Sequence, residues 1–148
     1  MGLPKDSKIN LTRKYPCGPS NQITDVYGVS VGHVTIDNPE QDIHTGVTAI
    51  LPHQGNVFQE KVMAGVSIIN GFGKSAGLVQ VEELGTIESP IIMTNTLSVG
   101  TGLTASVKYM LARNEDIGVK TGTVNCVVTE CNDGALSDIR GLHVTEED

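Results

Sequence analysis

The hydrophobic pattern of the chain changes period within PIIMTNTLSVGTGLTASVKYMLAR, residues 90–113. The run from Pro90 to Met93 is continuously apolar, which is typical of a buried strand. From Val99 onward, apolar residues recur every three or four positions, which predicts an amphipathic helix that ends near Arg113. Gly100 and Gly102 weaken the first turns of this helix by about 1 kcal/mol each relative to alanine. This cost suggests that another part of the backbone approaches the helix there.

Around this helix the sequence predicts only short strands. A regular alternation of strand and helix is absent, which favours an α+β fold with a largely antiparallel or mixed sheet over a Rossmann-type fold. Residues 1–22 are expected to form an extended lead-in, and residues 23–148 to form one domain. The expected strands are a pair within 23–34 that turns at Gly28, followed after an acidic loop at 37–44 by strands at 46–51, 66–69, 78–82, 90–93 and 124–128.

Composition excludes several classes of function. The 148 residues carry 17 acidic and 10 basic side chains, and the basic ones are scattered, so we expect no nucleic-acid partner. No apolar run approaches the roughly 20 residues of a membrane-spanning helix, and the start does not resemble a secretory signal. Three cysteines without a CxxC pair indicate reduced thiols and a cytoplasmic location. The four histidines share no metal-ligand spacing, so we expect no metal.

The segment Thr129–Gly141 carries the strongest signal for a functional site. Glu130 ends an apolar strand, where a buried carboxylate needs a partner, either a protein arginine or a substrate ammonium. Asn132, Asp133 and Gly134 are a strong turn signal, and turn formation alone would explain them.

Two further segments leave alternatives open. Residues 71–75, GFGKS, lack the earlier glycine of a phosphate-binding loop, because position 68 is Ile68. A glycine-rich turn is the default interpretation, and a loop that lines a substrate site is the alternative. Thr145 and the three acidic residues after it have the pattern of a helix start, with a solvated acidic tail as the alternative.

Six stretches in order resemble the N-terminal half of the DmpA-like aminopeptidases, the family of L-aminopeptidase/D-esterases and β-peptidyl aminopeptidases. The resemblance runs from about residue 21 to residue 144. Each stretch is weakly specific by itself, but six in the same order are specific together. The stretches are Ile23–Val29, Thr45–Pro52, Asn70–Gly73, Val81–Gly85, Thr94–Gly100 and Glu130–Gly141.

The resemblance implies a layered αββα sandwich similar to that of N-terminal-nucleophile hydrolases. It also implies a precursor that cuts itself before a serine, which then begins a second subunit and is the nucleophile. The substrates would be small peptides, amides or esters with a free N-terminal residue. The resemblance implies no metal or organic cofactor, and subunits that stay together in a homo-oligomer.

By position, the resemblance assigns Glu130 to the free amino group of the substrate and Asn132 to the wall of the same pocket. Some family members have tyrosine in place of Asn132. Asn70 and Asn95 are expected to support the site. The nucleophilic serine is expected beyond Asp148, so we expect the chain to be an N-terminal portion without a catalytic residue of its own. Two alternatives are an acyltransferase of the ornithine acetyltransferase type and a non-catalytic relic or assembly module.

Overall fold

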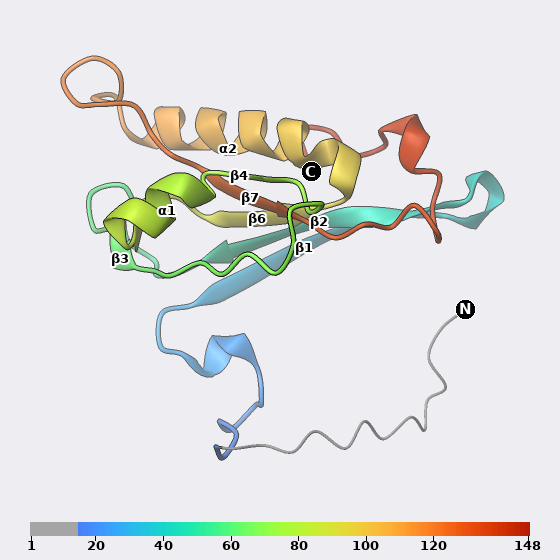
Figure 1. Ribbon diagram of the computed structural model, residues 1–148, viewed down its shortest axis with the longest axis horizontal. Coiled ribbons are helices and arrows are strands. Elements are labelled where there is room, and N and C mark those ends of the chain that lie inside the picture. Colours follow the sequence, from blue (N-terminus) through green and yellow to red (C-terminus); the bar gives the residue numbers. More distant parts are fainter. Residues whose placement is uncertain (1–14) are drawn as a thin grey trace.

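The computed structural model describes residues 15–148, which form a five-stranded mixed sheet with the helix α2 (Val99–Arg113) packed on one face (Figure 1). Residues 1–14 of the expected lead-in lie outside the described residues. The sheet confirms the α+β prediction. Its strands, in spatial order, are β1 (Ser30–Asn38), β2 (Ile43–Leu51), β6 (Ile91–Thr94), β7 (Val127–Glu130) and β4 (Ser75–Ala76).

The central pair of strands is parallel, and every other pairing in this sheet is antiparallel. β6 leads into α2, and the chain returns along β7, so α2 lies in the connection between the two parallel strands. In this register Thr94 lies opposite Glu130. The carboxyl ends of β6 and β7 therefore meet at one edge of the sheet, which brings the segments that follow them together.

The helix α2 packs closely on the sheet at Gly102. A Cβ atom added there would lie 3.3 Å from side-chain carbons of both Ile92 and Val128. Val128 is fully buried. Side chains, rather than the predicted backbone, thus approach this glycine closely. Nothing lies within 4 Å of a Cβ added at Gly100, so the same prediction was wrong there.

Two hydrophobic clusters hold the layers together. One, beside the C-terminal half of α2, contains Met110, Ile117 and Cys126. Burial raises the pKa of the Cys126 thiol, which keeps it protonated, and Cys126 packs here as a small buried hydrophobe. The other cluster contains Val81, Ile87 and Val127, and it joins α1 (Leu78–Leu84) and the small sheet of β3 (Val62–Met63) and β5 (Thr86–Ile87) to the face opposite α2.

The strand predicted at 78–82 was wrong, because these residues form α1. The alternation of apolar and polar residues suggested a strand, but Leu78 and Val81 are three residues apart and contact the same cluster. Gly77 precedes the helix with φ 81° and Gly85 follows it with φ 67°. These left-handed conformations favour glycine and bound a helix of only two turns.

Four other local predictions also differ from the structure. The strand predicted at 124–128 begins only at Val127 and continues to Glu130. Residues 66–69 pair with no strand, and Ile69 is almost fully exposed. Ile23–Asp25 is a 3₁₀ helix, stabilised by Asp25, whose carboxylate accepts backbone N–H groups from Ser20 and Gln22. The acidic loop is shorter than expected, because β1 and β2 extend into it and leave a tight turn around Pro39–Gln41.

The segment from Thr145 forms a turn with the contacts of a helix cap but without a helix. The Thr145 N–H donates to Asp148 Oδ2 at 2.7 Å, and Thr145 Oγ1 accepts the Glu147 N–H at 3.3 Å. This pattern is part of a capping box. The Lys108 ammonium also lies 2.6 Å from the Glu146 carboxylate, which ties the segment to α2.

Candidate functional site

Glu130 lies at the edge of the sheet where the two parallel strands end. It is the last residue of β7, and its backbone stays in register with Thr94 of β6. The ladder continues one residue further, because the Cys131 N–H donates to the Thr94 carbonyl at 2.8 Å. Residues of a strand alternate between faces, so Glu130 shares the α2 side of the sheet with Val128. Its half-buried carboxylate therefore points toward the start of α2.

Two hydrogen bonds hold the carboxylate of Glu130, one on each oxygen. Oε1 accepts the backbone N–H of Lys74 at 2.8 Å, and Oε2 accepts the hydroxyl of Thr96. The ammonium of Lys74 turns away, because it donates to the Phe72 carbonyl at 2.6 Å and lies 3.6 Å from the centroid of the Phe72 ring. Within residues 15–148, no lysine, arginine or histidine forms an ion pair with Glu130.

Asn70 shapes the loop that carries the Lys74 N–H. Its Oδ1 accepts the N–H groups of Phe72 at 3.0 Å and Gly73 at 3.3 Å, and the next N–H along the chain reaches Glu130. β4 begins immediately afterwards and pairs with β7 through Ser75 and Thr129. The glycine-rich loop thus lies against Glu130, and its role in lining a substrate site stays a prediction.

Asn95 fixes the second of the two segments that contact Glu130, the one that carries Thr96. It is 4% exposed, its Oδ1 accepts the Ser98 N–H at 3.0 Å, and its Nδ2 donates to Thr45 Oγ1 at 3.0 Å. These contacts cap the short 3₁₀ helix Thr96–Ser98 that leads into α2 and tie its start to β2. Thr96 follows directly and contacts Glu130. The sequence did not single out Thr96, and its position after the end of β6 was the signal that could have placed it beside Glu130.

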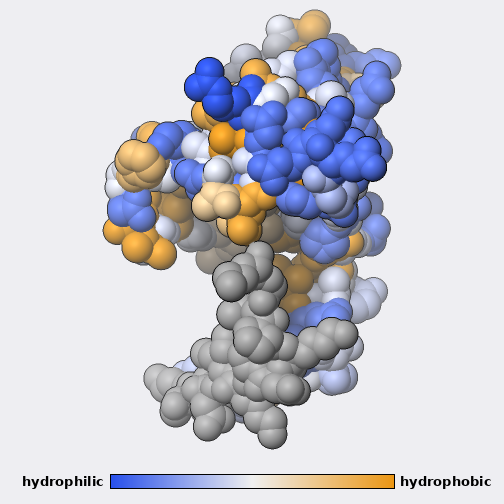
Figure 2. Space-filling model, turned by 90° about the vertical axis from the view of Figure 1, so that its right-hand side faces the viewer, coloured by the Kyte–Doolittle hydropathy of each residue, from blue (hydrophilic) through white to orange (hydrophobic). Residues whose placement is uncertain are grey.

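Asn132 is exposed and folds back on its own turn. Its Oδ1 accepts the Gly134 N–H at 2.9 Å, so turn formation explains this contact. The chain that follows is fastened to the β1–β2 hairpin by hydrogen bonds from the His44 N–H to Ser137 Oγ at 2.9 Å and from the Asp138 N–H to the Asp42 carbonyl at 2.7 Å. Hydrophilic residues cover much of this end of the molecule (Figure 2).

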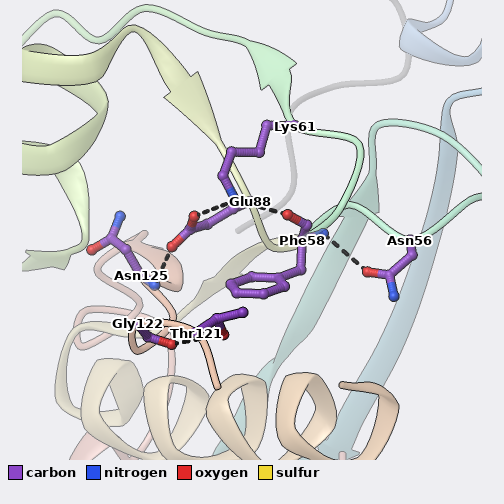
Figure 3. A network of polar contacts seen from close by, with 7 residues as sticks. All are labelled: Asn56, Phe58, Lys61, Glu88, Thr121, Gly122 and Asn125. Atoms are coloured by element: carbon purple, nitrogen blue, oxygen red, sulfur yellow. Dashed lines mark hydrogen bonds and ion pairs between the residues drawn. The ribbon is translucent and has the colours of Figure 1, made fainter. Parts of the chain in front are cut away.

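A buried carboxylate, that of Glu88, lies at the opposite end of β6 and already has a cation. Its Oε2 lies 2.8 Å from the Lys61 ammonium, and its Oε1 accepts the Asn125 N–H at 2.7 Å (Figure 3). Burial raises the pKa of Glu88, but the hydrogen bonds from Lys61 and Asn125 outweigh it and hold the pKa below its ordinary value. Glu88 therefore has a structural role. It differs from Glu130 in that a lysine of the protein, Lys61, neutralises its carboxylate.

Neither a metal site nor a membrane span is found in the part of the chain that the structure describes. Among residues 15–148, no three histidine, cysteine, aspartate or glutamate side chains are grouped to hold a metal ion. None of the helices in the same range is long and apolar enough to cross a bilayer. The expectation that the protein uses no metal or organic cofactor stays a prediction.

The sequence profile of peptidase family S58 matches residues 21–148. The chain belongs to peptidase family S58. The beta-peptidyl aminopeptidases BapA of Sphingosinicella microcystinivorans and Sphingosinicella xenopeptidilytica are 38% and 32% identical to it over 137 residues. These matches cover 88% of this chain, but only 33% and 34% of the relatives. The S58 chain thus spans about a third of the length of the curated relatives that it matches.

Solved structures show the same relationship. The PH0078 protein from Pyrococcus horikoshii OT3 is 54% identical, with a TM-score of 0.86 over 90% of this S58 chain and 40% of that one. The L-aminopeptidase D-Ala-esterase/amidase from Ochrobactrum anthropi is 39% identical, with a TM-score of 0.77 over 90% and 39% of the two chains. The latter is described as a new variant among the Ntn hydrolase fold. The predicted family is confirmed, and so is the predicted resemblance of the fold to that of N-terminal-nucleophile hydrolases.

Proposed function

We propose that this chain is the N-terminal, amine-recognising portion of a serine aminopeptidase that removes N-terminal residues from small peptides, amides or esters. One observation carries the proposal. The carboxylate of Glu130 is half-buried and held by two hydrogen-bond donors, yet no side chain of residues 15–148 neutralises it. A positively charged group of a ligand would complement this carboxylate.

The ammonium at the N-terminus of a substrate complements this carboxylate in charge and in hydrogen bonding. A carboxylate offers about four lone-pair sites, of which Lys74 and Thr96 use two. An ammonium donates up to three hydrogen bonds, and charge-assisted pairs of this kind are roughly twice as strong as neutral ones. A substrate with a blocked amine would leave the carboxylate without its partner, which is how the site would recognise a free chain end.

We propose that the nucleophilic serine comes from a C-terminal portion of the protein, expected beyond Asp148 and released by self-cleavage. The face of the sheet opposite α2 supports a further layer, because Val31, Ile50 and Met93 line an open groove there, beside Ile23. A second sheet on this face would complete the αββα sandwich. The homo-oligomer and the cytoplasmic location expected from the sequence stay predictions.

Ligand binding to the chain itself tests amine recognition. We expect L-alanine amide or β-alanine amide to shift backbone amide resonances around Glu130 in an NMR titration, and their N-acetylated forms to bind at least about tenfold more weakly. The Glu130→Gln variant should lose this preference while keeping its fold. Equal affinities for free and acetylated ligands would overturn the proposal.

An activity assay tests where the nucleophile resides. We expect the purified 148-residue chain to leave amino-acid p-nitroanilides intact. Turnover that a serine substitution within residues 1–148 abolishes would contradict this part of the proposal. The match to peptidase family S58 favours hydrolysis over acyl transfer of the ornithine acetyltransferase type. Between an enzyme portion and a non-catalytic relic, a preference for free amines favours the enzyme portion.

A further inference from the structure

We propose that Thr96 is a positioning residue for Glu130, and that it sets the direction in which the carboxylate meets the substrate amine. This inference rests on the function proposed for Glu130. The hydroxyl of Thr96 donates to Glu130 Oε2. Thr96 itself is 8% exposed. A buried hydroxyl that loses its partner costs free energy, so this pair is favoured over other rotamers of either side chain.

Thr96 is well placed for this role because its backbone is fixed from three sides. Asn95 caps the turn in which Thr96 lies, and its amide reaches across to Thr45 on β2. Thr94, two residues before Thr96, is held in the sheet because its hydroxyl donates to the Gly46 carbonyl at 3.0 Å. The backbone that carries the Thr96 hydroxyl is therefore held rigidly, which precise positioning of a binding group requires.

The two hydrogen bonds to Glu130, called here the Lys74 arm and the Thr96 arm, come from different kinds of group. The Lys74 arm is a backbone N–H, which any residue except proline would supply. The Thr96 arm is a side chain, so one substitution removes it without moving the loop at Asn70. Without it, Glu130 keeps its charge but gains rotamer freedom, and ordering it again on binding weakens the affinity for the amine. We expect a loss of about tenfold, the typical effect of one hydrogen bond to a charged group.

The test compares Thr96→Val, which keeps the shape, with Thr96→Ser, which keeps the hydroxyl. Thr104→Val is the matched control, because Thr104 is an exposed threonine on α2. The dissociation constants of L-alanine amide and N-acetyl-L-alanine amide are measured by NMR titration of each 148-residue variant. We expect Thr96→Val to weaken binding of the free amide about tenfold and to leave the acetylated amide unchanged. Thr96→Ser and Thr104→Val should bind like the unsubstituted chain.

The outcomes separate this inference from the proposed function. If Glu130→Gln removes the preference for the free amine and Thr96→Val does not, the role of Thr96 is overturned and the proposed function stands. If the unsubstituted chain shows no preference, the proposed function fails, and this inference fails with it. Should Thr96→Val not fold, the Thr96 methyl resonance of the unsubstituted chain decides. It must shift with the free amide and not with the acetylated one, and an unchanged resonance overturns the role.

Discussion

Lys74 presents its backbone N–H, not its ammonium, to Glu130. The N–H lies 2.8 Å from Glu130 Oε1, while the ammonium donates to the Phe72 carbonyl and covers the Phe72 ring. A hydrogen bond from the backbone orders the carboxylate without neutralising it. The nearest lysine in the loop thus leaves the charge of Glu130 available to a ligand cation.

Lys74→Ala is expected to leave amine binding almost unchanged. The variant retains the N–H that contacts Glu130 and loses a solvent-exposed positive charge together with its contacts to Phe72. Removing a like charge near an ammonium site should strengthen binding of L-alanine amide by no more than about twofold. Isothermal titration or NMR titration measures this, with Glu130→Gln as the reference for loss. A large decrease in affinity would mean that the Lys74 side chain contacts the ligand.

Asn95→Ala is expected to destabilise the start of α2. The substitution removes the side-chain acceptor for the Ser98 N–H and leaves the half-buried Thr45 without its partner. The free energy of unfolding should fall by about 1–2 kcal/mol, measured by urea denaturation. Asn95→Asp keeps the cap acceptor and should lose less. Equal losses for the two variants would show that the cap does not account for the effect.

Two glycines in the same helix should respond oppositely to alanine. Gly100→Ala meets no atom within 4 Å and should raise the free energy of unfolding by up to about 1 kcal/mol through helix propensity. Gly102→Ala places its methyl group 3.3 Å from Ile92 and Val128, both β-branched and stiff. Overpacking should lower stability by about 1–3 kcal/mol despite the better propensity. Thermal denaturation measures both, and stabilisation by both would contradict the packing described at Gly102.

Glu88 should make the chain less stable in acid. Its pKa in the folded chain lies below the ordinary value of 4.5, so its contribution to stability is complete above pH 4.5. The contribution is lost as the pH falls through the folded pKa and the carboxylate that pairs with Lys61 becomes protonated. Glu88→Gln should be less stable than the unsubstituted chain at pH 7 and should lose less stability on acidification. Urea denaturation from pH 7 to pH 3 measures this, and the exposed Glu115→Gln is the control. Parallel pH profiles for the chain and Glu88→Gln would contradict the role of Glu88.

The sequence predicted those elements whose periodicity is long or whose apolar run is continuous. The helix at Val99–Arg113 and the strand at Ile91–Thr94 are confirmed almost residue for residue. The prediction at 78–82 was wrong, because in a run as brief as 78–84 an apolar alternation and a three-residue spacing coincide. The helical spacing prevailed over the strand-like alternation because Gly77 and Gly85, with their positive φ angles, bound a helix there.

The candidate site was likewise predictable from the sequence only in part. Glu130 was predictable because a carboxylate at the end of an apolar strand is unusual, and the structure adds its two donors. The contacts of Thr96 and of the Lys74 N–H with Glu130 could not be predicted from the sequence. Thr96 lies 34 residues from Glu130 and is brought to it by the pairing of β6 with β7. Lys74 lies 56 residues away and is brought to it by the pairing of β4 with β7. Asn70 and Asn95 were chosen by resemblance, and the contacts found for them are within their own turns and to Thr45.

The most direct measurement of the central claim is the carbon resonance of the Glu130 carboxylate during ligand titration. A chain labelled with ¹³C at glutamate Cδ is titrated at constant pH with L-alanine amide and, separately, with N-acetyl-L-alanine amide. The Glu130→Gln variant assigns the signal. We predict a saturable shift of the Glu130 resonance with the free amine and none with the acetylated ligand. An unmoved Glu130 resonance, or the same shift with both ligands, would contradict the claim that Glu130 binds the substrate amine.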